Sequence, residues 1–215
     1  MREGEGSELT VEVYGSFAEL LDSGLQLVVI DVPIGIMQSS PRAVDRAARE
    51  LLRDRACCVF SAPYRPMLYA RSHDEASAIR AGIDGKRCTR QAFSIFKKIR
   101  EVDALLTPAL QERVREGHPE VTFAVMQDGR PMENSKKSRL GRMARLDALR
   151  RHFPKVDDSV AERRPKGVGI DDVLDAYALL WTARRIAGGS ARTLPILGVG
   201  SDQRDIRGLR AEIVA

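Results

Sequence analysis

The stretch LQLVVIDVPIGI, residues 25–36, decides the expected fold. The uninterrupted apolar run at 27–30 is typical of a strand buried on both faces of a sheet. Asp31 interrupts this run, and Pro33 and Gly35 end it because neither residue suits the interior of a strand. In open α/β sheets, ligands bind at the carboxyl ends of the strands. Asp31 is therefore a candidate functional residue, with an Asx turn leading into Pro33 as the alternative.

A second acidic group opens the long apolar run near the C-terminus and consists of Asp171, Asp172 and Asp175. Residues three and four apart share one face of a helix, so these carboxylates lie near one another. Carboxylates at such spacing repel each other unless a cation lies between them. The alternative is a helix cap followed by a solvated first turn. Taken with Asp31, the group predicts a divalent-metal site formed by Asp31, Asp172 and Asp175.

Strand patterns alternate with helical patterns along the chain, which favours an α/β domain with a mixed or parallel sheet. A length of 215 residues suits one domain, expected over 1–215 with a helical insertion around 64–117. The remaining expected strands are 8–14, 56–62, 121–125, 194–197 and 212–214. The expected helices are 17–21, one starting at Ser40-Pro41, 67–81, 91–106, 107–117, 146–153 and 171–187.

Composition limits the classes of partner. The net charge of +5 favours a polyanion such as nucleic acid, although 35 basic residues stand against 30 acidic ones. Aromatic residues make up only 5% of the chain, which argues against an extended base-stacking platform. Three cysteines without a C-x-x-C pair indicate a reducing compartment. With neither a signal peptide nor an apolar membrane span, we expect a cytoplasmic protein without a membrane partner.

Two further sets of residues are candidates. Arg42 and Arg46 follow the strand that ends at Asp31 and are expected to bind phosphate. The alternative is a solvated helix face with local ion pairs worth roughly 0.3–0.5 kcal/mol each. Glu120, after His118, is placed at the entry of a strand, where it would add a metal ligand while His118 assists proton transfer. Local hydrogen bonding at a strand edge is the alternative for this pair.

In their order along the chain, six motifs resemble a bacterial and archaeal family of predicted nucleases with an RNase H-like fold, usually labelled as a domain of unknown function. The resemblance spans about residues 25–214. The motifs are VVIDVPIG at 28–35, RAVDRAAR at 42–49, VFSAP at 59–63, KIREVD at 98–103, EGHPE at 116–120 and DDVLDA at 171–176.

The resemblance implies a mixed five-stranded sheet flanked by helices, with carboxylates gathered from two strands and a late helix. On that pattern Asp31 is the middle-strand carboxylate, and Asp172 with Asp175 is the late-helix pair. Family members begin with a Gly-x-Asp-Gly strand, and nothing here matches it. The first strand is therefore expected to be missing or shortened, or encoded upstream of Met1. A sheet with an unpaired edge would favour a homodimer.

Three functions are expected from these observations. The first is Mg²⁺- or Mn²⁺-dependent hydrolysis of phosphodiesters by Asp31, Asp172 and Asp175, with Glu120 as an addition. The second is a catalytically incomplete module of the same fold that binds nucleic acid or protein. The third is an enzyme acting on a small phosphorylated substrate. Fold analogy carries the first expectation, and a fold alone does not determine function.

Overall fold

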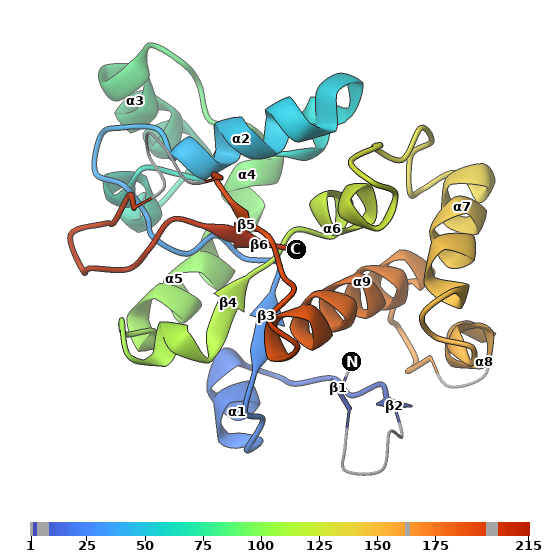
Figure 1. The fold of residues 1–215 in the computed structure, drawn as a ribbon. Coiled ribbons are helices and arrows are strands. Elements are labelled where there is room, and N and C mark those ends of the chain that lie inside the picture. Colours follow the sequence, from blue (N-terminus) through green and yellow to red (C-terminus); the bar gives the residue numbers. More distant parts are fainter. Residues whose placement is uncertain (1, 4–8, 162–163, 197–201) are drawn as a thin grey trace.

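The computed structural model describes residues 2–3, 9–161, 164–196 and 202–215. The chain forms an α/β structure in which helices surround a few short strands (Figure 1). The central pair is parallel and joins β3 (Val28–Ile30) to β4 (Val114–Glu116), with Val28 opposite Val114. Asp31 follows β3 directly, as the sequence predicted, so its carboxylate lies at the carboxyl end of the central pair.

The other described strands form two antiparallel pairs, β1 (Arg2–Glu3) with β2 (Leu9–Thr10) and β5 (Thr193–Leu194) with β6 (Ile213–Val214). β6 lies beside β4, near the centre of Figure 1. In the described ranges the strands thus form three two-stranded sheets rather than the expected five-stranded one. The α/β class is confirmed. The RNase H-like sheet and a dimer through its edge stay predictions.

Helices far outnumber strands in the described part of the chain. The α-helices are α1 (Phe17–Asp22), α2 (Ala43–Leu52), α3 (His73–Asp84), α4 (Arg90–Ser94), α5 (Phe96–Leu105), α6 (Pro119–Met126), α7 (Arg139–Arg150), α8 (Val156–Ala161) and α9 (Ile170–Ala187). The 3-10 helices are η1 (Arg53–Cys58), η2 (Arg65–Tyr69) and η3 (Leu110–Glu112).

Three expected elements are wrong. Residues 121–125 lie in α6 instead of a strand, because Pro119 starts a helix whose first residues are buried almost all round. Residues 107–117 contain β4 rather than a helix, since pairing with the distant β3 decides their conformation. The strand expected at 56–62 is replaced by η1 and an extended segment. The helix after Ser40-Pro41 begins at Ala43, and the late helix is confirmed as α9.

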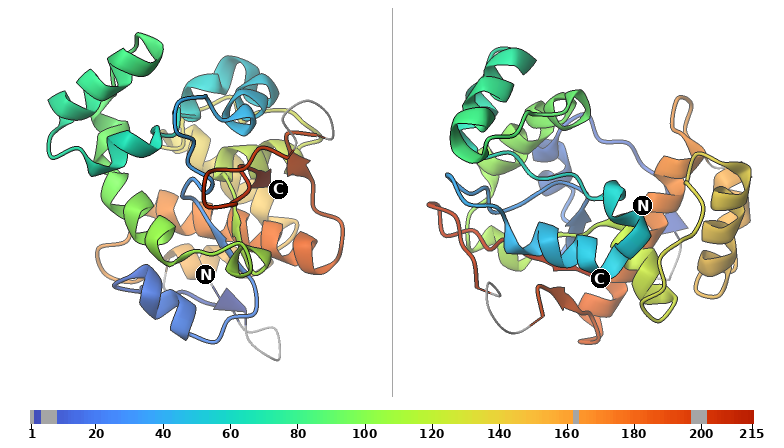
Figure 2. Two further views of the ribbon diagram at one scale, coloured as in Figure 1. Left: turned by 90° about the vertical axis from the view of Figure 1, so that its left-hand side faces the viewer. Right: turned by 90° about the horizontal axis from the view of Figure 1, so that it is seen from above.

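Helices pack on two sides of the central strands. The group α3, α4 and α5 lies on one side in Figures 1 and 2, and α7, α8 and α9 lie on the other. α9 contacts β3 and α6, so its carboxylates are carried toward the end of β3. Among the described residues, no helix combines the length and apolar character needed to cross a bilayer.

Gly117 allows α9 to pack closely against β3 and β4. A Cβ atom at this position would lie 2.5 Å from Cγ1 of Val29 and 2.7 Å from Cδ2 of Leu179, far inside contact distance. The backbone N–H of Gly117 also donates to the carbonyl of Ile30 at 2.9 Å. Because only glycine lacks the Cβ atom, this residue lets β4, β3 and α9 meet directly behind Asp31.

Candidate functional site

Asp31 lies where solvent meets the carboxyl end of β3. Its side chain is exposed, and it borders a small cavity shared with Glu116 and His118. The surrounding protein atoms nevertheless raise the pKa of the Asp31 carboxyl, and the negative charge of Glu120 adds to the rise. A protonated His118 would oppose it, and the positive charges of Lys136 and Lys98 also oppose it. A ligand can therefore reach Asp31, and a nearby cation would stabilise the ionised form of its carboxyl.

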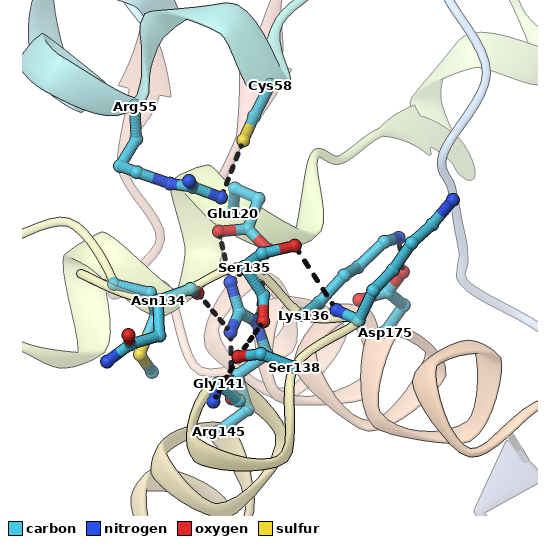
Figure 3. Close-up of polar contacts among 12 residues, drawn as sticks. Arg55, Cys58, Glu120, Asn134, Ser135, Lys136, Ser138, Gly141, Arg145 and Asp175 are labelled. Atoms are coloured by element: carbon cyan, nitrogen blue, oxygen red, sulfur yellow. Dashed lines mark hydrogen bonds and ion pairs between the residues drawn. The ribbon is translucent and has the colours of Figure 1, made fainter.

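Asp175 approaches the same region from α9, within its second turn. Its Oδ2 accepts a hydrogen bond from Nζ of Lys136 at 2.5 Å, and Figure 3 shows these two side chains adjacent. Its Oδ1 is buried and has no hydrogen-bond partner. Burial raises the pKa of Asp175 to about 6 against the lowering effect of Lys136, and the charges of Asp31 and Glu120 contribute to the rise. The negative charge of Asp31 is thus close enough to affect Asp175, and an ion site shared by the two carboxylates stays a prediction.

Lys136 comes from the segment between α6 and α7, and the sequence analysis did not single it out. Burial alone would lower the pKa of its ammonium group, but Asp175, Asp31 and Asp171 outweigh burial and raise it. Lys136 is therefore a charged partner of the acidic pair. Nothing in its local sequence distinguishes it from Lys137, because only the long-range packing of this segment against α9 selects it.

Glu120 has a different role from the one expected. It lies in the first turn of α6, is buried, and accepts hydrogen bonds from Nε and Nη2 of Arg145 at 2.6–3.0 Å (Figure 3). The same guanidinium donates to the carbonyls of Asn134 and Gly141 and lies over the ring of Phe123. Both Glu120 oxygens already have charged donors, so the carboxylate fixes α7 against α6. A metal-ligand role for Glu120 stays untested.

His118 caps α6 and faces the small cavity beside Asp31. Its Nδ1 accepts a hydrogen bond from the backbone N–H of Val121 at 3.4 Å. This bond favours the neutral tautomer with its proton on Nε2. His118 can therefore offer a proton from Nε2 near Asp31, in keeping with the expected proton-transfer role, which stays a prediction.

The two candidate phosphate-binding arginines differ. Arg42 is buried, and its Nη atoms contact Glu116 at 2.5 Å and Asp45 at 3.2 Å. Arg46 is exposed, with Nε 3.9 Å from Glu50. Arg42 therefore supports the fold from within, while Arg46 remains free to contact solvent. Neither arrangement tests the predicted contact with phosphate.

The three carboxylates expected on the late helix have different environments. Asp172 is exposed, and its Oδ2 accepts a hydrogen bond from the backbone N–H of Gly169 at 3.0 Å, which caps the start of α9. Asp171 contributes charge toward Lys136. Asp175 alone carries an unpartnered oxygen toward the interior. The capping alternative therefore accounts for the position of Asp172, and its assignment as a metal ligand remains untested.

Two carboxylates would be enough only for a cation that needs few protein ligands. Within the described ranges, no three His, Cys, Asp or Glu side chains are grouped so that they could enclose one ion. Mg²⁺ keeps several waters and is usually held by one or two carboxylates together with substrate phosphates. Asp31 and Oδ1 of Asp175 meet that smaller requirement, and Oδ1 has an unmet demand for a positive partner.

These features define an α/β protein with an acidic pair and a lysine at the carboxyl end of its central parallel strands. A family described as "Protein of unknown function (DUF429)" matches residues 2–196. The chain belongs to this family. No curated protein and no solved structure matches it.

Proposed function

We propose that this protein is an Mg²⁺- or Mn²⁺-dependent hydrolase of phosphodiester bonds, a nuclease with an RNase H-like arrangement of its acidic residues. The observation that carries the proposal is the buried, unpartnered Oδ1 of Asp175 beside Asp31. An acidic oxygen without a donor is destabilising in a folded protein unless a ligand satisfies it. A divalent ion supplies the missing partner.

The position of the pair supports the same function. Asp31 ends β3 of the parallel pair, the edge at which α/β sheets bind ligands. Asp175 comes from a late helix that packs on β3. A strand-end carboxylate joined by a late-helix carboxylate is the arrangement that the resemblance to predicted nucleases implies. Asp172 and Glu120 are outside this proposal because their oxygens already accept from Gly169 and Arg145.

Each side chain has a distinct task in the proposed reaction. Asp31 and Asp175 would hold the ion, which activates water and stabilises charge on the phosphoryl oxygens when bound. Lys136 holds Oδ2 of Asp175, which leaves Oδ1 for the ion. His118 can donate the Nε2 proton to the departing oxygen. The positive charges of Lys98 and Lys136 both lower the pKa of Asp31, and they favour an anionic substrate at this site.

Hydrolysis assays test the proposal. We expect the protein to cleave RNA or DNA with Mn²⁺ or Mg²⁺ and to stop when EDTA is added. Asp31→Asn and Asp175→Asn should each reduce the rate by at least about a hundredfold, the scale seen when an electrostatic group essential to the transition state is removed. Asp157→Asn is the matched control, because Asp157 pairs with Arg150 on the surface. Cleavage that survives Asp175→Asn would contradict the assignment.

One observation favours a second function, that of a binding module without turnover. Lys136 already neutralises much of the charge on Asp175, and the described part of the chain holds no group of three His, Cys, Asp or Glu side chains that could enclose an ion. Salt-sensitive binding of nucleic acid, unchanged by EDTA and without cleavage, would favour this function. Turnover of bis-p-nitrophenyl phosphate without affinity for polynucleotides would instead favour a small phosphorylated substrate.

A further inference from the structure

Residues from η2, α4 and α5 (α4 and α5 are labelled in Figure 1) line an open groove. Its volume of about 530 Å³ is within the range of roughly 300–1,000 Å³ typical of ligand sites. Aromatic and cationic side chains line it together. They are Tyr69, Arg71, Phe93, Phe96, Lys97 and Arg100.

The aromatic side chains provide a supported flat surface. Tyr69 is 69% exposed, which is unusual for a large ring without a partner. Phe93 forms edge-to-face contacts with Phe96 at 5.2 Å and with His73 at 5.9 Å between ring centroids. Phe96 is itself buried, so Phe93 is held in place before any ligand arrives. An exposed ring beside a fixed ring suits the face of a planar ligand.

The charged side chains that line the groove, Arg71, Lys97 and Arg100, are all basic. Residues 86–100 include six basic residues and no acidic ones. Where the structure describes the chain, none of these six forms an ion pair, although Nη1 of Arg100 donates to the carbonyl of Leu68 at 2.5 Å. Cations that are not neutralised by the protein create a positive field that attracts a polyanion. The ligand of the groove should therefore be both planar and negatively charged.

Positive charge is present both in the groove and near Asp31. Lys97 lines the groove, and its neighbour Lys98 is close enough to Asp31 to lower the pKa of that carboxyl. The two lysines occupy adjacent positions in the first turn of α5. α5 therefore carries one lysine in the groove and another whose positive charge acts on Asp31.

We propose that this groove binds single-stranded nucleic acid, stacking one unpaired base against Tyr69 and Phe93 while Arg71 and Lys97 contact the adjacent phosphates. Bases within a duplex cannot reach such a surface because they are already stacked on their neighbours. The inference rests on the proposed function for its role in hydrolysis and names the form of substrate that function would use. One aromatic subsite is compatible with the low aromatic content of the chain.

Fluorescence anisotropy tests the groove without any need for turnover. The full chain is titrated in EDTA with labelled single-stranded RNA and DNA 12-mers and with a duplex of the same length. Tyr69→Ala should weaken binding of the single strands by about tenfold, the lower end of the loss on removing one stacked ring. Ile206→Ala removes a similarly exposed apolar side chain, 68% exposed, and should leave binding unchanged.

The charge is tested separately. Lys97→Gln should reduce the slope of log affinity against log salt by about 0.7, the effect of losing one phosphate contact to a single strand. Lys155→Gln, which neutralises an exposed lysine between α7 and α8, serves as the control. Single-strand affinity unaltered by Tyr69→Ala, or failure of the folded protein to bind either single strand, would overturn the inference. Because EDTA is present, neither result depends on whether Asp31 and Asp175 support hydrolysis.

Discussion

Two buried acid–base clusters in this protein differ in one respect. In the first, Arg65 binds Asp103 through two hydrogen bonds of 2.8 and 2.9 Å and Asp205 through one of 2.6 Å. The remaining oxygen of Asp205 accepts from the backbone N–H groups of Arg207 and Leu209. In the second cluster, Asp175 has Lys136 on one oxygen and nothing on the other. Every carboxylate oxygen of the first cluster has a donor in the protein, although Nε of Arg65 is buried without an acceptor, whereas one carboxylate oxygen of the second has none. By this criterion for the carboxylates, we call the first cluster closed and the second open.

The difference indicates how to separate structural from functional charge in this fold. A buried carboxylate whose oxygens are all satisfied contributes to a defined packing arrangement, here between η2, α5 and the C-terminal segment. A buried carboxylate with a free oxygen costs stability and persists when a ligand or a reaction requires it. The Arg65 cluster therefore belongs to the framework, and the Asp175 cluster belongs to the site.

The largest expected loss of stability comes from removing one acidic partner of Arg65 in the closed cluster. Asp103→Asn removes the charge that faces Arg65 and leaves a buried guanidinium with only Asp205 as its charged partner. Breaking one partner of a buried ion pair typically costs about 3–5 kcal/mol. Urea denaturation at pH 7 should show a loss of this size. A loss below about 1 kcal/mol would mean that the closed cluster is not a framework element.

Asp175→Asn should increase the free energy of unfolding, and the size of the increase should depend on pH. The pKa of Asp175 is raised from its ordinary 3.8 to about 6, so the folded chain keeps this proton to higher pH than the unfolded chain. Between about pH 4 and 6 the unfolded chain binds fewer protons, and the stability of the wild type falls as pH rises. The shift corresponds to at most about 3 kcal/mol.

The variant lacks this titration, so it should match the wild type near pH 4 and exceed it by about 1–3 kcal/mol at pH 7. Denaturation curves of both proteins at pH 4, 5, 6 and 7 measure the difference directly. Asp157→Asn is again the control, because Asp157 lies in an exposed ion pair. If the variant were less stable than the wild type at pH 7, Asp175 would be a satisfied structural group like Asp103.

Gly117→Ala should lower the stability of the protein where β3 packs against α9, next to the open cluster. The added methyl group would collide with Val29 and Leu179, which join β3 to α9 behind Asp31. Overpacking of this kind costs about 1–3 kcal/mol. Thermal unfolding measures the loss, and Gly82→Ala, where the new Cβ meets nothing within 4 Å, is the matched control. Equal stability of the two variants would show that β3 and α9 are not tightly joined at Gly117.

The smallest effect should come from Asp172→Ala. This change removes the acceptor for the Gly169 N–H at the start of α9 and should cost about 0.5–1 kcal/mol. Hydrolysis by the folded variant should remain near the wild-type rate. A hundredfold loss of activity, comparable to that of Asp175→Asn, would instead place Asp172 among the metal ligands, as the sequence first suggested.

The sequence predicts the parts of this molecule that local pattern determines. Apolar residues at 27–30 indicate the central strand, and the amphipathic stretch after Asp171 indicates α9. The position of Asp31 at the end of β3 was also predictable, because the apolar run stops there.

Other parts depend on contacts between distant residues. β4 forms because it pairs with β3, and the paired residues Val28 and Val114 are 86 positions apart in the sequence. The local pattern at residues 107–117 favoured a helix instead. α6 is apolar on nearly every face, so its pattern does not separate helix from strand. Lys136 and Arg145 gained their acidic partners through tertiary packing, which no spacing rule specifies.

Direct measurement of Mn²⁺ binding tests the central claim, that Asp31 and Asp175 together form a cation site. The electron paramagnetic resonance signal of free Mn²⁺ reports the bound fraction during a titration at pH 7. We predict that the wild type and Asp157→Asn bind the ion alike, whereas Asp31→Asn and Asp175→Asn each weaken binding by at least about tenfold. Equal affinity in the wild type and the Asp175→Asn variant would contradict the account.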